Sequence, residues 1–195
     1  MLPVFASFNC FIQAVNSDEG YESCLKCSGK LPDRLSSSLM FWSYGFWPSK
    51  STVFSMPYRG THELPPEKTR GFQLDVLISA LSGSMIALGD AIGSQNSKII
   101  LQTCRDDGLL FKPERPLLPI DLMFIPNNKP YVCSTYSVNG GKQWHYVLSV
   151  LTDDNKNIER FITLQDLGIA SGKWVYFDYF DKLVMSIDAE TKLCG

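Results

Sequence analysis

The sequence has few charged residues and no basic cluster. Its 195 residues include 18 Lys and Arg and 20 Asp and Glu, which gives a formal net charge of −2. The basic residues are scattered along the chain. A nucleic-acid-binding protein gathers such residues on one surface, where they neutralise phosphates. We therefore expect no nucleic-acid partner.

Long apolar runs are missing as well. None approaches the roughly 18 residues that a membrane-spanning helix needs, so we expect no membrane partner. The opening segment, residues 1–14, is apolar but lacks the basic start and the small-residue cleavage site of a signal peptide. The sequence leaves the cellular compartment open.

The sequence also lacks a complete metal-binding or redox motif. Cys24 and Cys27 form a CxxC motif among six cysteines, but no second ligand pair is present to complete a zinc site. Its flanks resemble loops rather than the strand and helix of a redox site. We expect a local disulfide or two free thiols here, no metal site and no cofactor.

Nucleophile motifs are equally scarce. Ser43 and Ser84 do not lie in a G-x-S-x-G elbow, and no glycine-rich phosphate loop is present. His62 and His145 have no nucleophilic partner in the sequence. Because His145 lies in a β-rich run between two aromatic residues, we expect it to be structural rather than catalytic.

The composition is that of an ordinary globular protein, with 45% hydrophobic and 19% charged residues. The pattern along the chain predicts three regions. Residues 1–34 are poorly patterned, residues 35–119 carry α/β signals, and residues 120–195 carry strand signals. The proline-rich stretch 112–119 is interpreted as a stiff linker, with the domain boundary at its end.

The middle region predicts alternating strands and helices. Ser38–Tyr44 is aromatic-rich and favours a short buried strand. After a long connection, Glu67–Leu81 shows helical spacing of apolar residues, and Ser82-Gly83-Ser84 ends that helix. Met85–Leu88 is a short apolar run typical of a parallel strand. A second helix is predicted over Gln95–Cys104, with Ser94 as its cap.

The last region predicts an antiparallel sheet or sandwich of about five strands. Two β-rich runs surround Asn139-Gly140-Gly141, which indicates a hairpin. Further strands are predicted over Glu159–Leu164, Lys173–Phe180 and Leu183–Ile187, each separated from the next by turn residues.

The order of these elements resembles the α-galactosidase and raffinose-synthase group of glycoside hydrolases. The resemblance rests on ISALSGSMIALGD, NSKIILQTCRDDGLLFKPERP and DLMF within residues 70–124, and more loosely on LQDLGIASGKWVYFDYFDKLVMSID. It implies the last one or two βα units of a (β/α)8 barrel, the TIM barrel, followed by an antiparallel β-domain. The fold class expected is thus α/β plus β.

The same resemblance implies that the catalytic residues are missing. The family uses two carboxylates, on the fourth and sixth barrel strands, which lie about 5–5.5 Å apart in retaining enzymes. The matched residues begin near the seventh strand, and no position here corresponds to either carboxylate. No catalytic residue is therefore assigned.

Asp90 and Trp47 are the candidate substrate-binding residues. Asp90 follows the predicted strand, a position that faces the sugar pocket in the family. The alternative is that its carboxylate only caps the following turn. Trp47 lies beside Pro48 in the long connection and is the best candidate aromatic platform for a sugar ring. Both residues are expected to face one concavity on the carboxyl side of neighbouring parallel strands.

The sequence thus predicts a fragment of an α-glycosidase-like protein that binds carbohydrate but, as it stands, has no catalysis. The alternative is a non-catalytic carbohydrate-binding or scaffold protein that pairs with a partner chain completing the barrel. Neither the sugar nor its linkage follows from the sequence.

Overall fold

The structure is a computed structural model. It describes residues 31–48, 53–55, 66–83, 86–110, 112–125, 131–150, 161–170, 172–179 and 181–194. The CxxC motif, the apolar opening segment and His62 lie outside the described residues, as do almost all of residues 1–34.

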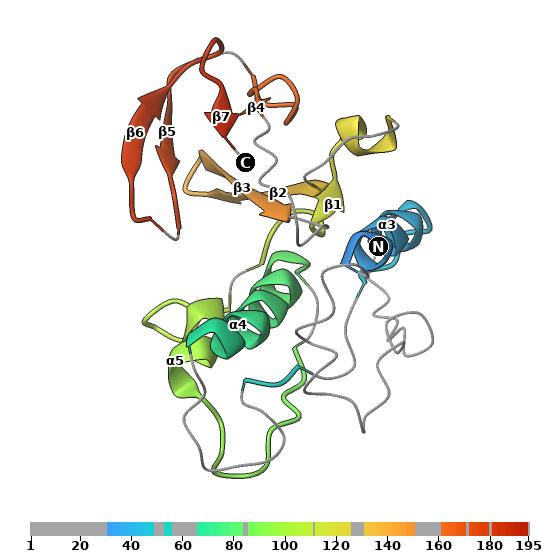
Figure 1. Ribbon diagram of the computed structural model, residues 1–195, viewed down its shortest axis with the longest axis vertical. Helices are drawn as coiled ribbons and strands as arrows, with labels where there is room; N and C mark the ends of the chain where they lie inside the picture. The colour runs from blue at the N-terminus through green and yellow to red at the C-terminus, as the bar shows by residue number, and fades with distance from the viewer. Residues whose placement is uncertain are drawn as a thin grey trace.

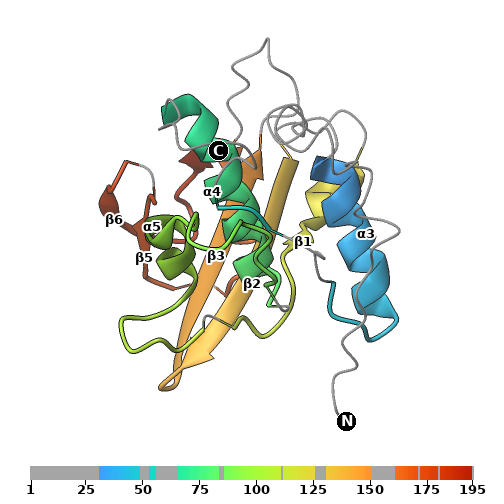
Figure 2. The same ribbon diagram turned by 90° about the horizontal axis from the view of Figure 1, so that it is seen from below.

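A long β-hairpin forms the middle layer of the molecule. Strands β2 (Tyr131–Asn139) and β3 (Lys142–Val150) pair antiparallel along their whole length, and β1 (Leu118–Pro119) joins the other edge of β2. Figure 1 shows helices α3 (Leu31–Ser43) and α4 (Pro66–Leu81) on one side of this sheet. In Figure 2, α4 crosses in front of the hairpin.

Two small antiparallel ribbons lie on the other side of the hairpin. One pairs β4 (Phe161–Ile162) with β7 (Leu193–Cys194), and the other pairs β5 (Trp174–Phe177) with β6 (Val184–Ile187). The predicted antiparallel character of this region of the chain is confirmed. Its strands belong to three separate sheets in the described residues, whereas the sequence predicted one sheet or sandwich.

Each face of the hairpin has its own apolar core, because successive residues of a strand point to opposite faces. Cys133 and Leu148 face the helices and pack with Leu35 of α3 and Leu81 of α4. Val132 faces the other way. It belongs to a cluster drawn from the ribbons and the segments beside them: Ile120, Ile162, Leu164, Leu167, Ile169 and Ile187.

The hairpin turn has the geometry that its sequence predicts. Gly140 and Gly141 both have positive φ, 57° and 74°. A two-residue turn needs φ > 0 at both central positions to match the right-handed twist of the strands, and glycine adopts this conformation without steric cost. The hairpin prediction is confirmed.

The predicted strand at 38–44 is wrong, because these residues belong to α3. Leu35, Ser38 and Phe41 are buried at three-residue spacing, which is the period of one helix face. Gly45, with φ 81°, ends the helix, and its amide donates to the Trp42 carbonyl while the Phe46 amide donates to the Phe41 carbonyl. This is the Schellman arrangement of a helix end.

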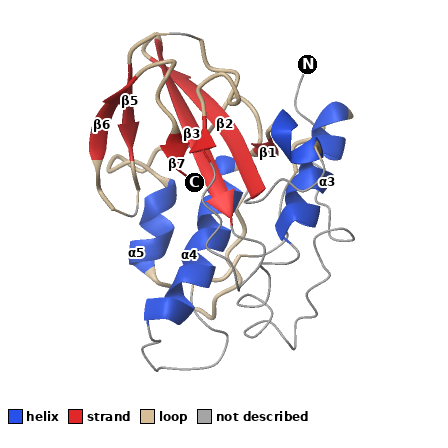
Figure 3. Ribbon diagram, turned by 45° about the horizontal axis from the view of Figure 1, so that its top comes forward, coloured by secondary structure: helices blue, strands red, loops and turns tan. Residues whose placement is uncertain are grey.

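The other two helix predictions fare differently. Helix α4 covers the predicted range, and Gly83, with φ 67°, follows it as expected. The second helix is shorter than predicted, since α5 (Ser97–Ile100) continues only as the 3₁₀ turn Leu101–Thr103. Its cap is Asn96 rather than Ser94, because the Asn96 side chain accepts from the amides of Lys98 and Ile99. Figure 3 shows the helices together on one side of the strands.

The end of the stretch interpreted as a linker belongs to the central sheet. Leu118 and Pro119 form β1, and the preceding Leu117 is fully buried in the helix-facing core. The prolines favour an extended backbone, which suits an edge strand as well as a linker. Residues on both sides of the predicted boundary at 119 therefore contribute to one core.

One parallel pairing is present in the described residues. Val53 and Leu88 form an isolated parallel bridge, and helix α4 lies between them in the chain. A parallel connection of this kind requires a crossover, usually a helix. The structure thus supplies one crossover of the predicted kind, and the barrel itself stays a prediction.

Candidate functional site

Asp90 lies directly beyond the parallel bridge. The Val53 amide donates to the Ala87 carbonyl at 2.8 Å, and the Gly89 amide donates to the Val53 carbonyl at 2.9 Å. These two bonds fix the direction of both segments. Ser55 and Asp90 follow the bridge on their respective segments, so both lie at the carboxyl end of the pair.

The Asp90 carboxylate accepts hydrogen bonds from Ser55. The Ser55 amide lies 3.0 Å from Oδ1 and 3.1 Å from Oδ2, and the Ser55 hydroxyl donates to Oδ2 at 2.8 Å. Ser55 is 1% exposed, so its amide would otherwise be buried without a partner. Bonds to a charged acceptor are stronger than neutral ones, which makes Asp90 a firm link between the two strand ends.

Asn96 extends this network to a third segment. Its amide donates to the Ser55 hydroxyl at 2.8 Å, while its side chain caps α5. We call Ser55, Asp90 and Asn96 the Asp90 cluster. The sequence reasoning missed Ser55 and Asn96. An Asn directly before Ser97 was the available signal for the second, because Asn is a favoured cap residue.

The hydrogen bonds of Asp90 bear on its two predicted roles, which are capping its own turn and binding a sugar. Its partner Ser55 is 35 residues away, so the carboxylate joins two distant segments rather than capping only its own turn. This places a half-buried carboxylate just beyond the isolated parallel bridge between Val53 and Leu88, where the sequence predicted the end of a strand. Whether it also binds a sugar hydroxyl stays a prediction.

Trp47 packs against the turn that follows α4. Its ring meets Trp42 edge to face with centroids 5.2 Å apart, and the Lys112 ammonium lies 5.8 Å from its centroid. A Cβ added at Gly83 would overlap the Trp47 ring. These contacts give Trp47 a packing role, and a sugar-platform role stays a prediction.

Asp90 and Trp47 are not brought together, so the expected shared concavity is wrong. Trp47 precedes Val53 in its segment and contacts Gly83, which precedes Leu88 in the other. Both therefore lie toward the amino end of the parallel pair. Asp90 lies beyond its carboxyl end. The sequence argument failed because it assumed a strand before Trp47, where the structure has the end of α3.

A second polar cluster lies on the ribbon-facing side of the hairpin. Arg115 donates from Nη2 to the Ser134 hydroxyl at 3.2 Å, and its guanidinium carbon lies 5.6 Å from the Tyr136 ring centroid. His145 pairs across the hairpin with Tyr136, at 5.8 Å between ring centroids. Trp174 of β5 meets His145 edge to face at 5.4 Å. We call these residues the seam cluster.

The seam cluster contains two nitrogen atoms without hydrogen-bond partners. Among the buried side-chain nitrogen and oxygen atoms of the described chain, Arg115 Nε and His145 Nε2 are the ones without a bond. Burial, followed by the positive charge of Arg115, lowers the pKa of His145 below its ordinary value of 6.5. The imidazole is therefore neutral at pH 7, and the structural rather than catalytic role of His145 stays a prediction.

Cys133 and Cys104 differ in how reactive their thiols are expected to be. Burial raises the pKa of the Cys133 thiol far above its ordinary range, so it stays protonated in the helix-facing core. Cys104 is half-buried and free.

Within the described residues, no three His, Cys, Asp or Glu side chains gather into a group that would hold a metal ion. No helix in the described regions of the chain is long and apolar enough to cross a membrane.

Comparison with protein-family models, curated proteins and solved structures gives no significant match to this chain.

Proposed function

We propose that the chain belongs to a carbohydrate-active protein like those of the α-galactosidase and raffinose-synthase group. In this proposal residues 53–90 form a βαβ unit of a (β/α)8 barrel, and the strands after residue 130 form its β-domain. The chain binds carbohydrate and does not hydrolyse it.

The arrangement at the end of the parallel pair is the observation that supports this proposal. Val53 and Leu88 run parallel with α4 as their crossover, and the Asp90 cluster follows both strand ends. Ligand sites of parallel α/β folds lie at the carboxyl ends of the strands. Carboxylate and amide groups there suit the hydroxyl groups of a sugar.

The absence of hydrolysis follows from the resemblance. A retaining glycosidase needs a nucleophile and a general acid/base on facing carboxylates. The matched segments of this chain correspond to neither of the strands that carry them. In the described residues, the Asp90 carboxylate accepts hydrogen bonds from the amide and the hydroxyl of Ser55.

Sugar binding is tested by nuclear magnetic resonance of the whole chain. Methyl α-galactoside and raffinose are titrated while the amide signals of Ser55 and Asp90 are followed. We expect saturable shifts that are lost in Asp90→Asn and kept in Asp107→Asn, whose carboxylate is exposed. The absence of shifts with every sugar in a glycan panel would refute the proposal.

Hydrolysis is tested separately with aryl α-galactosides. We expect no release above a heat-inactivated control. Turnover that disappears in Asp90→Asn would show that the chain is catalytic and that the carboxylate argument is wrong. The two assays therefore distinguish binding from chemistry.

The alternative is a non-catalytic scaffold that pairs with a partner chain completing the barrel. It is favoured by the exposure of Leu88, which is 44% exposed although parallel strands are normally buried on both faces. In the described residues its only bridge partner is Val53. Light scattering tests the solitary chain: we expect self-association or aggregation through unpaired strand edges if the partner is needed for solubility.

A further inference from the structure

His145 lies at the contact between the central hairpin and the β5–β6 ribbon. It faces Tyr136 on the neighbouring strand, and the ring of Trp174 on β5 meets it at an interplanar angle of 87°. Trp174 pairs with Ile187 of β6, which is buried in the ribbon-facing core. His145 thus touches the ribbon where the ribbon joins the sheet.

The surroundings of His145 contain a positive charge and no described negative one. The titratable or charged groups facing it are Tyr136 on β2 and Arg115 on the segment before β1, whereas β5 contributes the uncharged Trp174. Neither Arg115 nor His145 forms an ion pair with a described carboxylate. Imidazole Nε2 is buried and has no hydrogen-bond acceptor.

We propose that His145 makes the docking of the β5–β6 ribbon on the central hairpin sensitive to protons. Neutral imidazole packs between Tyr136 and Trp174 and keeps the ribbon docked. Protonated imidazole loosens the ribbon, and the hairpin itself stays folded.

Two physical costs act on the protonated form. A half-buried cation loses part of its hydration, and an N–H group at Nε2 finds no acceptor. Arg115 adds like-charge repulsion. Aromatic rings attract cations. The Arg115 guanidinium already lies over the Tyr136 ring, so this ring stabilises a protonated His145 less than a free ring would.

The direction of the pH effect follows from the linkage between protonation and opening. Burial and Arg115 lower the pKa of His145 in the docked state, whereas the opened state has the ordinary value near 6.5. The docked state therefore binds fewer protons. Its advantage over the opened state is complete above the ordinary pKa and falls as the pH drops below it.

Hydrogen exchange of the whole chain at pH 7.5 and pH 5.0, corrected for intrinsic exchange rates, measures this opening. We expect protection of residues 174–177 and 184–187 to fall at pH 5.0, while β2 and β3 keep theirs. Ribbon protection falls by about tenfold for each unit by which docking lowers the His145 pKa. This full effect is reached only when the pH lies below the pKa of His145 in the docked state. A titration of the imidazole signals gives that pKa independently.

His145→Gln is the test variant and His62→Gln the control. The glutamine side chain stays neutral at both pH values, so we expect equal ribbon protection at pH 7.5 and pH 5.0 in His145→Gln. In the control, ribbon protection should still fall at pH 5.0. Arg115→Gln raises the His145 pKa and reduces the change.

Three results would overturn the proposal: a wild-type His145 pKa at or above 6.5, pH dependence that persists in His145→Gln, or equal loss of protection in all strands. The imidazole titration uses the wild-type chain, so it decides even where a variant fails to fold. A sugar-binding failure would leave these results unchanged.

Discussion

The segments around the Asp90 cluster and the hairpin β2–β3 differ in how far apart in sequence their bonded residues lie. Ser55 is bonded to Asp90 and Asn96, which are 35 and 41 residues away. In the hairpin, pairing starts at Asn139 and Lys142, on either side of the turn, and extends outward one residue at a time. Closing a long loop costs more chain entropy than closing a short one.

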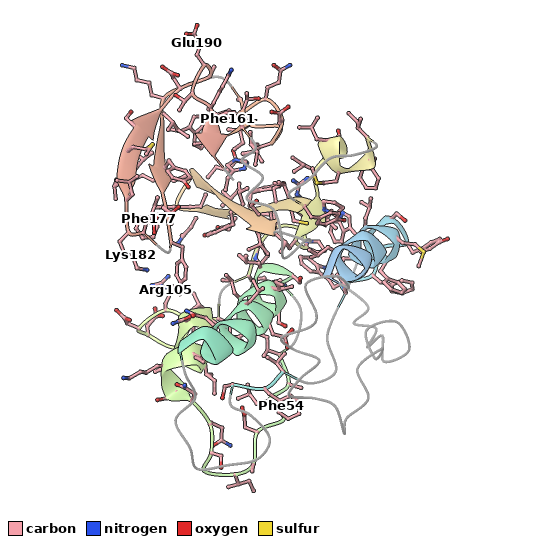
Figure 4. All side chains as sticks on the ribbon, in the orientation of Figure 1. Phe54, Arg105, Phe161, Phe177, Lys182 and Glu190 are labelled. Atoms are coloured by element: carbon pink, nitrogen blue, oxygen red, sulfur yellow. The ribbon has the colours of Figure 1, made fainter. Side chains whose placement is uncertain are left out.

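The comparison shows where the structure depends on single residues. Around Asp90, the hydrogen bonds of Ser55 join described segments that are distant in the chain, so one substitution removes several of these bonds. In the hairpin, each bond is one of many along a continuous ladder. In Figure 4, which has the orientation of Figure 1, Phe54, next to Ser55, lies on the far side of α4 from the hairpin.

Thiol alkylation should give the largest contrast. Cys133 lies in the hairpin, where burial raises its pKa, whereas Cys104 lies just beyond the Asp90 cluster and is half-buried. Because the thiolate is the reactive form, we expect Cys133 to react with iodoacetamide at pH 8 more than about a hundredfold more slowly. Peptide mapping by mass spectrometry measures both rates. Similar rates in the native protein would mean that the hairpin opens as readily as the rest.

Gly83→Ala should give the next largest effect. Gly83 has φ 67°, and a Cβ there would overlap the Trp47 ring. Left-handed backbone and overpacking together predict a loss of about 2–4 kcal/mol in the free energy of unfolding. Gly108→Ala is the matched control, because it has φ 81° but nothing near its Cβ position, and should cost about 1–2 kcal/mol. Urea denaturation measures both, and equal losses would remove the Trp47 contact as a cause.

Asp90→Asn should give a smaller loss, of about 1.5–3 kcal/mol, because it weakens bonds to a charged acceptor and leaves the buried Ser55 less well satisfied. Asp107→Asn is the control. Its carboxylate forms a 2.8 Å ion pair with Arg105 in which both side chains are more than half exposed, and such pairs contribute about 0–1 kcal/mol. A loss no greater than that of the control would show that other bonds hold the two strand ends.

Local signals in the sequence led to correct predictions wherever one short segment decided the outcome. The helix over 67–81, its glycine ending and the hairpin around Asn139-Gly140-Gly141 follow from spacing and turn chemistry, and the structure confirms them. The strand at 38–44 was wrong because seven residues are too few to separate a strand from a segment of a helix.

The candidate sites depend on contacts between residues that are far apart in the sequence, which residue spacing within one segment does not predict. Asp90 was found because it ends an apolar run, but Ser55 lies too far away in sequence to be recognised as its partner. The seam cluster joins Arg115, His145 and Trp174 from three segments. The proline stretch at 112–119 looked like a linker because prolines favour extended backbone in a linker and an edge strand alike.

By itself the sequence determined the local elements, since helix spacing, turn glycines and strand alternation act over a few residues. It also determined which side chains face opposite sides of the hairpin, because that alternation is fixed by the backbone. Only the tertiary structure decided which distant polar groups meet. The Asp90 cluster is satisfied and the seam cluster is not, and that difference arises from packing between segments, where burial sets both hydrogen bonding and the pKa of His145.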